Sequence, residues 1–349
     1  ITFLVKNPKE KRNKAMIYYH DIGDYLSREE KLKLIKQFKS IENIEWQVIN
    51  PNDKQDWVNQ RDGLFDTLVP LCPDKKFDIW AKAVFTTNAI GVASNRDSWV
   101  TGFSRVKTER NIHSMIDFYQ TQIGKNELSM DSTKISWTRS LKKDVANGVM
   151  HMYSDDQFCD VMYRPFIKSN LYYYKPFIES PGVWSSLFPK GYNNISIVTQ
   201  GKGCRRPYSL LISDNLVDLN NMDAGAQCFP LYWFEENTKK KKELSLFGEE
   251  NSQDDFIRHD GISDWILTEV RRRYSGTKYI TKEHIFYYVY GILHSPQYRE
   301  RFEDDLKKSL LESNQYGFSN RIAFNTLLGI SEKETLAELQ LETEILKLQ

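Results

Sequence analysis

The sequence has few cysteines, and their spacing excludes two kinds of stabilised small fold. Its 349 residues include four cysteines, and none of them forms a C-x-x-C pair. Zinc knuckles need paired cysteines and disulfide frameworks need a dense set of them, so neither is supported. Unpaired thiols fit a reducing compartment, and we therefore expect a cytoplasmic protein. The four residues are Cys72, Cys159, Cys204 and Cys228.

Long apolar runs and an excess of one charge are also missing. No stretch approaches about 18 uninterrupted apolar residues, and no basic segment leads into an apolar run, so we expect neither a membrane span nor a targeting segment. The 48 Lys and Arg residues balance 47 Asp and Glu residues to a formal net charge of +1. This balance excludes a uniformly basic DNA-coating protein, and any nucleic-acid surface must therefore be local.

Motifs for catalysis and nucleotide binding are absent. There is no [DNS]-P-P-[YFW] tetrapeptide for gripping a flipped adenine, since Asn7-Pro8 and Asn50-Pro51 are followed by Lys and Asn. Neither G-x-x-x-x-G-K-[ST], nor G-x-G-x-x-G, nor H-E-x-x-H occurs. We therefore predict no catalytic residues, no bound cofactor and no metal site within this chain. An enzyme is the least supported of the function classes that follow.

The stretch from Thr281 to Lys308 predicts two helices joined by a tight corner. Thr281 is placed to cap the first helix, and apolar residues follow it at spacings of three and four. Ser295 then Pro296 begins the second helix, because Ser caps free amides and Pro fits the first turn. The aromatic run from Phe286 to Tyr290 is typical of a face that packs against the rest of a protein. Residues 108–123 and 336–346 show similar helical spacing.

Residues 182–213 contain no Asp or Glu but do contain four cations. Arg205 and Arg206 fall in a loop with Gly and Pro, between predicted strands at residues 194–199 and 208–212. Arginines in such a loop can bind guanine O6 and N7 in a bidentate way. The absence of acids removes repulsion from phosphate, so the window favours DNA contact. The other two cations are Lys190 and Lys202.

The block KISWTRSLKKDVANG, residues 134–148, predicts a short strand at 135–137 and then a helix between Thr138 and Gly148. Arg139, Lys142 and Lys143 fall in its first turns, where cations oppose the helix dipole by about 0.3–1 kcal/mol each. A bound phosphate would relieve that mismatch. An ordinary solvated helix face explains the same residues, and both interpretations stay open.

Asn95 and Arg96 lie in a predicted tight turn with Asp97, after strand-like residues 81–94. Such a turn is either a hydrogen-bonded corner or a ligand-binding site. Residues 227–234 predict another strand. The block NTKKKKELSLFGEENSQDD after it has the composition of a linker, and Lys239 to Lys242 within it fit either a solvated loop or contacts to phosphate.

Three blocks of the sequence, taken in order, resemble one family. They are residues 134–148 together with YRPFIKSNLYYY at 163–174, FYYVYGILHSPQYRERFEDDLKKSL at 286–310, and LAELQLETE at 336–344. They are similar to the C-terminal region of type ISP restriction-modification polypeptides. These are single chains that join a nuclease, an ATP-driven translocase, an adenine methyltransferase and a target recognition domain. The resemblance implies sequence-specific recognition of double-stranded DNA, for an enzyme that methylates adenine and cleaves after translocation.

The resemblance also implies a domain organisation and a mixed α+β fold, with a β-rich central recognition region, flanking helices and a C-terminal helical layer. Residues 1–50 would be the closing strands and helix of a methyltransferase-like domain, whose catalytic part lies upstream. Residues 51–236 would be the target recognition region, 237–260 a linker and 261–349 the C-terminal helical region. We expect a hairpin of residues 1–5 with 15–20 at the start, followed by a helix that Ser27 and Glu30 cap and a strand at residues 44–49.

Partners and cofactors follow from the same resemblance. S-adenosylmethionine, ATP and magnesium would bind to the parent enzyme and not to this segment. The expected partners are double-stranded DNA and the upstream methyltransferase and ATPase domains of the same polypeptide, and we expect a monomer with no membrane partner. Counting Arg164 from the block at 163–174, the predicted DNA-binding residues are Asn95, Arg96, Arg139, Lys142, Lys143, Arg164, Lys190, Lys202, Arg205 and Arg206.

One alternative belongs to a different function class. The chain would then be a helical coupler whose aromatic faces dock against sister domains and which touches DNA only incidentally. Docking predicts a large exposed apolar patch near residues 286–290, whereas recognition predicts a concave basic cleft between the central strands and the C-terminal helices. The two possibilities therefore predict different surfaces, one apolar and one basic.

Overall fold

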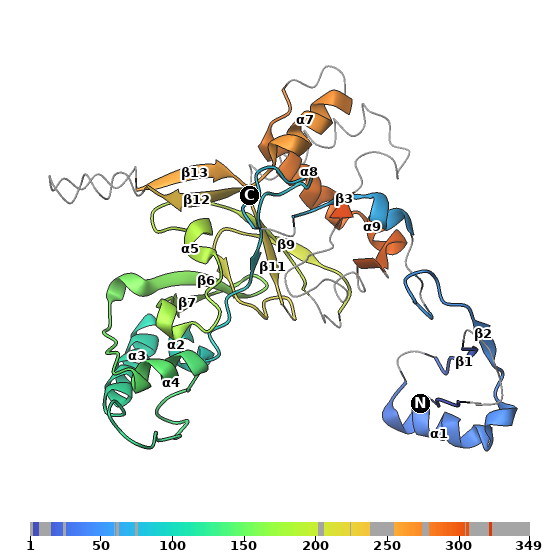
Figure 1. Cartoon of the computed structure of the whole chain (residues 1–349), viewed down its shortest axis with the longest axis horizontal. Coiled ribbons are helices and arrows are strands. Elements are labelled where there is room, and N and C mark those ends of the chain that lie inside the picture. The colour runs from blue at the N-terminus through green and yellow to red at the C-terminus, as the bar shows by residue number, and fades with distance from the viewer. Residues whose placement is uncertain are drawn as a thin grey trace. The chain divides into compact units, whose positions relative to one another are not determined.

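The computed structural model of the chain divides it into two compact units, residues 1–62 and 63–349 (Figure 1). The structure describes residues 3–6, 15–23, 26–58, 60, 63–73, 76–201, 206–223, 225–237, 255–273, 279–303, 305–306 and 321–322. The predicted helix at 336–346 and the cations Lys239 to Lys242 lie outside these residues. Each helix in the described part of the chain is too short or too polar to cross a bilayer.

The first unit contains a two-stranded sheet and one helix. Strand β1 (Ile17–Tyr19) pairs antiparallel with β2 (Gln47–Ile49), and α1 (Arg28–Phe38) separates them in the chain. Ser27 and Glu30 form the predicted capping box. The predicted hairpin with residues 1–5 is wrong, because β1 pairs with β2 and residues 3–6 form no strand.

Apolar side chains of the first unit remain accessible. None of its described residues is buried, and α1 has no buried position. Large apolar residues of the unit stay exposed, among them Tyr18 at 53%, Trp46 at 41% and Val48 at 57%. Because burying apolar surface is the main driving force for folding, this unit has little core of its own.

The second unit is organised around a four-stranded antiparallel sheet in the order β4-β11-β8-β9. Successive strand residues point to opposite faces. Val198, Leu211 and Cys228 therefore enter one hydrophobic core, while Ile197, Leu210 and Phe229 enter another. Every residue of β8 and β11 is buried, so this sheet is a middle layer between two cores. The bounds are β4 Ala89–Ile90, β8 Ser196–Thr199, β9 Leu210–Ser213 and β11 Gln227–Pro230.

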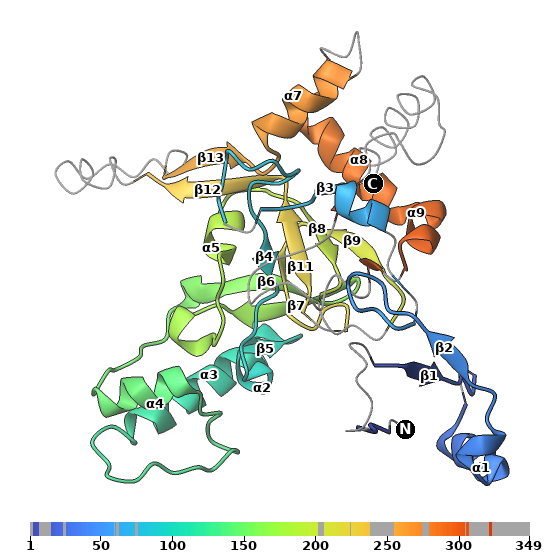
Figure 2. The same cartoon turned by 45° about the vertical axis from the view of Figure 1, so that its right-hand side comes forward.

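Helices cover one face of the middle sheet (Figure 2). They are α7 (Asp264–Arg273), α8 (Lys282–His294) and α9 (Pro296–Arg301), and they confirm the predicted C-terminal helical layer. Thr281 and Ser295 cap α8 and α9 as predicted. The 3-10 helix η2 (Gly63–Thr67) and strand β3 (Val69–Pro70), which pairs with β14 (Arg321–Ile322), join the same layer.

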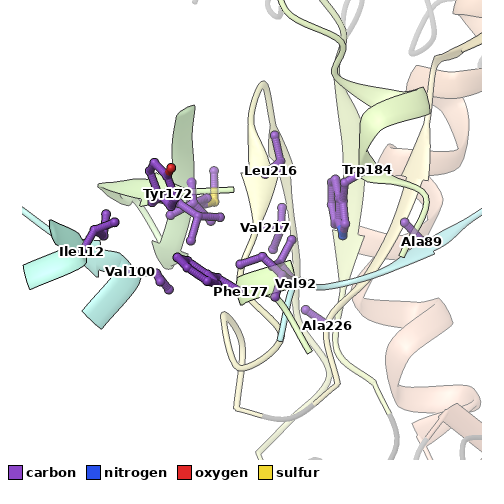
Figure 3. Close-up of a cluster of buried hydrophobic side chains, with 14 of the residues drawn as sticks. Ala89, Val92, Val100, Ile112, Tyr172, Phe177, Trp184, Leu216, Val217 and Ala226 are labelled. Atoms are coloured by element: carbon purple, nitrogen blue, oxygen red, sulfur yellow. The ribbon is translucent and has the colours of Figure 1, made fainter. Parts of the chain in front are cut away.

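A second sheet, in the order β10-β6-β7-β5, covers the other face. Figure 3 shows their shared core, in which Ile112 and Tyr172 lie at one end, Trp184 and Ala89 at the other, and Leu216 and Val217 between them. The strands are β5 Thr101–Gly102, β6 Phe158–Arg164, β7 Ile167–Tyr172 and β10 Leu216–Val217. The helices are α2 Asp97–Val100, α3 Arg105–Gln120, α4 Arg139–Ala146 and α5 Trp184–Leu187. The mixed α+β class is thereby confirmed.

Two strand predictions are wrong for non-local reasons. The strand expected at 227–234 is divided at Leu231, because Gly261 from a later segment donates its amide to Leu231 O at 2.7 Å. Its second part is β12 (Tyr232–Glu236), which forms a separate ribbon with β13 (Phe256–Asp260), so the last five residues of the predicted linker 237–260 form a strand. Residues 135–137 pair with no strand, and Ile135 simply anchors the chain in the core before α4.

Gly261 lies where three chain segments meet. Its amide contacts Leu231, and its carbonyl accepts from Thr86 N at 2.7 Å. A Cβ added at Gly261 would lie 1.9 Å from Pro230 O, which real Cβ atoms do not tolerate. The backbones of these segments therefore approach each other as closely as only glycine allows.

Candidate nucleic-acid interface

Helix α4 presents the predicted cations Arg139, Lys142 and Lys143 to solvent. Its Thr138 cap accepts from Leu141 N, and Leu141 and Val145 bury the opposite face of the helix. The three cations are exposed, and none of them forms an ion pair with a described residue. Because no ion pair with a described residue engages these three side chains, α4 offers their positive charge to a polyanion.

A carboxylate already occupies the neighbourhood of the α4 N-terminus. Ser140 Oγ donates to Glu179 Oε2 at 3.0 Å, so an acid from a distant segment lies beside the helix start. Negative charge at that end complements the helix dipole. The dipole mismatch predicted from the sequence is therefore partly relieved within the protein, and the case for phosphate contact depends on the exposed side chains.

Arg96 lies beneath α4 rather than at the surface. It is 3% exposed, and its Nη2 donates to Thr138 Oγ1 at 2.6 Å. Its Nε and Nη1 find no hydrogen-bond partner among the described residues. Burial lowers the pKa of the Arg96 guanidinium to about 10, and the nearby Glu179 opposes that shift. Arg96 thus holds the helix cap in position, and its own nitrogens are not accessible to a duplex.

The turn containing Asn95 is a hydrogen-bonded corner with an exposed tip. Asn95 has φ +54°, and its carbonyl accepts from Ser136 Oγ at 3.2 Å. Ser94 Oγ donates to the Asp97 carboxylate, which closes the turn. The Asn95 side chain stays exposed. The structure therefore brings Asn95, Arg96 and the α4 cations together, with Arg96 on the inside.

His151 supports α4 from below and was not identified in the sequence. It is 2% exposed, its Nε2 lies 3.3 Å from Asp144 Oδ2, and its Nδ1 lies 3.2 Å from the Tyr174 hydroxyl. The rings of Tyr119 and Phe177 pack against it. Because its partners lie on other elements, no local sequence signal distinguishes this histidine from the rest.

Burial lowers the pKa of His151, with Arg96 adding to the shift and Asp144 opposing it. The His151 pKa is lower in the folded chain than in the unfolded chain, where it is near 6.5. Between these two values the unfolded chain binds more protons, so the free energy of unfolding falls as the pH falls through that interval. We expect the wild-type free energy of unfolding to fall between about pH 7.5 and about pH 5.5 more steeply than that of His151→Gln. Urea unfolding at both pH values measures this. His113→Gln, at an exposed site, is the control, and equal slopes for wild type and His151→Gln would contradict the expectation.

Arg164 and Lys190 lie on other elements. Arg164, at the end of β6, donates from Nη1 to Asp218 Oδ1 at 2.8 Å, and its guanidinium lies 3.9 Å from the centre of the Tyr163 ring. Lys190 Nζ lies 2.7 Å from Asp156 Oδ1, with both side chains nearly fully accessible. Such an exposed pair contributes only about 0–1 kcal/mol, so Lys190 remains available to a phosphate.

Strands β8 and β9 bracket the predicted base-reading loop as expected. Gln200 closes it, since its Nε2 donates to Pro207 O at 2.8 Å and its Oε1 accepts from Ser209 N at 3.3 Å. Arg206 is exposed, whereas Lys202 and Arg205 lie outside the described residues.

Residues 218–223 together with Gly225 connect the start of this loop to the end of β6. Asn221 Nδ2 donates to Met162 O at 2.9 Å, and a Cβ on Gly201 would lie 1.7 Å from Gly225 O. The loop and Arg164 therefore flank the same turn. The run of Asn and Asp at 218–223 was the available sequence signal for this junction.

The exposed apolar patch expected of a helical coupler is not found at residues 286–290. Phe286 and Val289 are buried, and the three tyrosines of this run are partly buried against the same core. The aromatic run is thus used to pack α8 onto the middle sheet.

Comparison with known proteins gives one family match. The profile of the Type ISP C-terminal specificity domain matches residues 83–311. No sequence among the curated proteins matches.

Several solved structures are similar to this chain. A nuclease-deletion mutant of the Type ISP restriction-modification enzyme LlaGI, in complex with a DNA substrate mimic, shares 30% identity over 85% of this chain with a TM-score of 0.70. The ATP-dependent Type ISP enzyme LlaBIII bound to DNA shares 28% identity over 96%, with a TM-score of 0.76. The DrdV–DNA complex shares 26% identity over 95%, with a TM-score of 0.74. This chain covers 26%, 20% and 30% of those chains, respectively.

Proposed function

Since this chain belongs to the family of Type ISP C-terminal specificity domains, we propose that it reads a short sequence of double-stranded DNA for a larger restriction-modification enzyme. The assignment as a specificity domain follows from the family. Reading of particular bases by particular side chains is our proposal. DNA binding as such is supported by two relatives, since LlaGI was solved with a DNA substrate mimic and LlaBIII was solved bound to DNA.

The observation that carries the proposal is the free cationic face of α4. Arg139, Lys142 and Lys143 are exposed and unpaired with any described residue, and the buried Arg96 fixes the start of their helix. Phosphate contacts of this kind position a duplex without reading it. Base reading is assigned to the acid-free loop between β8 and β9, whose arginines can bind guanine. Asn95, Arg164 and Lys190 are further proposed contacts, and the concave basic cleft stays a prediction.

Residues 1–50 are proposed to complete a methyltransferase-like domain. The support is the accessible apolar surface of β1, β2 and α1 in a unit without buried residues among those described. Such surface gains stability by packing against a larger partner. Residues 51–236 would then be the recognition region and 261–349 the helical region, and the linker predicted between them at 237–260 would end before β13.

The parent enzyme is proposed to methylate adenine and to cleave after ATP-driven translocation. One relative, LlaBIII, is described as ATP-dependent. S-adenosylmethionine, ATP and magnesium are assigned to the parent and not to this segment. The upstream domains of the same polypeptide would be its protein partners, and a monomer is expected.

Duplex binding measured by fluorescence anisotropy tests the proposed function. We expect the chain to bind long mixed-sequence duplexes at low salt, with affinity that falls steeply as salt rises because counterions are released. As a control, excess heparin is added as a competing polyanion to the same labelled duplex. No binding at low salt, or binding indifferent to salt, would contradict the proposal. If the full-length parent enzyme binds the duplex and this chain does not, the DNA-binding affinity lies outside this segment.

A further inference from the structure

We propose that Phe166, at the tip of the β6–β7 hairpin, is a wedge that inserts between stacked bases of the duplex. The inference rests on the proposed function and adds a side chain that senses how easily a base step opens. Proteins that bend DNA often insert an apolar side chain in this way and partly unstack a step.

Phe166 has no role in packing. It is 88% exposed, whereas Phe158 and Tyr172 on the same hairpin contact each other at 5.2 Å between ring centroids. Its neighbour Ile167 is 45% exposed. An aromatic side chain left in water at a hairpin tip returns no stability to the fold.

The backbone at Phe166 favours a different residue. Arg164 pairs with Ile167, so Pro165 and Phe166 form a two-residue turn. Proline holds its φ near −65°, and Phe166 has φ +61°, which among the tight hairpin turns fits only type II. Glycine or asparagine suits that position, and a bulky side chain there is strained. Strain at an exposed, unpacked residue points to a role outside the fold.

Two cations flank Phe166 in the chain, Arg164 two residues before it and Lys168 two residues after it, and each forms an ion pair. Arg164 is fixed by Asp218 and by its stacking on Tyr163. Lys168 Nζ lies 3.1 Å from Asp214 Oδ1, with both side chains more than half accessible. The Lys168–Asp214 pair is exposed and therefore weak, so Lys168 can contact a phosphate beside an inserted ring, whereas Arg164 is held in place by the mostly buried Asp218.

DNA fits this tip better than a protein pocket does. Asn221 contacts the end of β6, and Gly225 lies against Gly201, where the acid-free loop begins, so the hairpin that carries Phe166 and the start of that loop adjoin the same segment. A ring that enters a protein pocket would need no cations beside it. Docking to a sister domain is therefore kept as an outcome of the test.

The first experiment compares an intact duplex with the same duplex carrying one abasic site, by anisotropy with the whole chain. An abasic step is already unstacked, so a wedge enters it at lower cost. We expect wild type to bind the abasic duplex about tenfold more tightly, and Phe166→Ala to lose that preference. Phe103→Ala is the matched control, because Phe103 is another exposed phenylalanine, at 72%.

The second experiment uses Phe166→Gly, which separates the wedge from stability. Glycine accepts the positive φ, so the midpoint of thermal unfolding should rise by about 2 °C while the abasic preference disappears. Phe166→Trp keeps a flat ring and should keep the preference.

The outcomes distinguish the two claims. If wild type binds neither duplex, the proposed function and the wedge both fail. If wild type binds both duplexes equally, or if Phe166→Ala keeps the preference, the wedge alone is overturned. Unchanged DNA binding in Phe166→Ala together with lost association with the parent's other domains would also overturn it, in favour of docking.

Discussion

Replacing Arg139, Lys142 and Lys143 together by Gln should weaken binding to mixed-sequence duplexes by about 100-fold near 0.1 M salt. Each lost phosphate contact lowers the slope of log K against log salt by about 1, so the slope should fall by about 3. Gln removes the charge while keeping an unbranched polar side chain of similar helix propensity, and the replaced residues are exposed, so the fold should persist. Anisotropy titrations at several salt concentrations measure both quantities.

The matched control removes three other exposed lysines, Lys31→Gln, Lys33→Gln and Lys36→Gln on α1. It changes the net charge of the chain by the same amount in the other unit. If the loss came from overall charge, both triple variants would weaken binding equally. That result, or an unchanged salt slope in the α4 variant, would show that α4 contacts no phosphate.

Gly261→Ala should lower the free energy of unfolding of the second unit by about 3 kcal/mol, because the added methyl group would clash with the carbonyl oxygen of Pro230. Backbone from the middle sheet and from the segment before α7 would have to move apart, and both are buried there. Urea unfolding followed by tryptophan fluorescence measures the change.

Gly148→Ala is the comparison that isolates the steric cause. Gly148 has φ +67° and open space around the position of a Cβ, so only the backbone preference is lost, at about 1 kcal/mol. A Gly261→Ala variant as stable as Gly148→Ala would mean that the three segments do not meet as closely as described.

The sequence predicted best those elements whose signals are local. Thr281 and Ser295 are caps followed at once by helical spacing, and the structure begins α8 and α9 there. Contacts between distant segments were not predictable in this way. The single strand expected at 227–234 is divided by Gly261, and β1 finds its partner only at residues 47–49.

The candidate interface shows the same division. The cations of α4 follow from a capped amphipathic segment, and the structure leaves them exposed. Arg96 was predicted together with them, yet it is buried and donates to Thr138, a contact between segments 42 residues apart that no local pattern reveals. Phe166 was missed although a signal existed: an aromatic residue follows Pro165 in a position where a turn favours glycine or asparagine.

The middle sheet has a consequence for how recognition can diversify. Strands β8 and β9 contribute side chains to a hydrophobic core on each face of the sheet. A shift in their pairing register would disrupt both cores at once, so the register is strongly defined. The segment that they bracket can then exchange its residues without disturbing its supports. A graft of residues 201–206 from a relative should accordingly transfer base preference as an interchangeable cassette, while the surrounding scaffold keeps its shape.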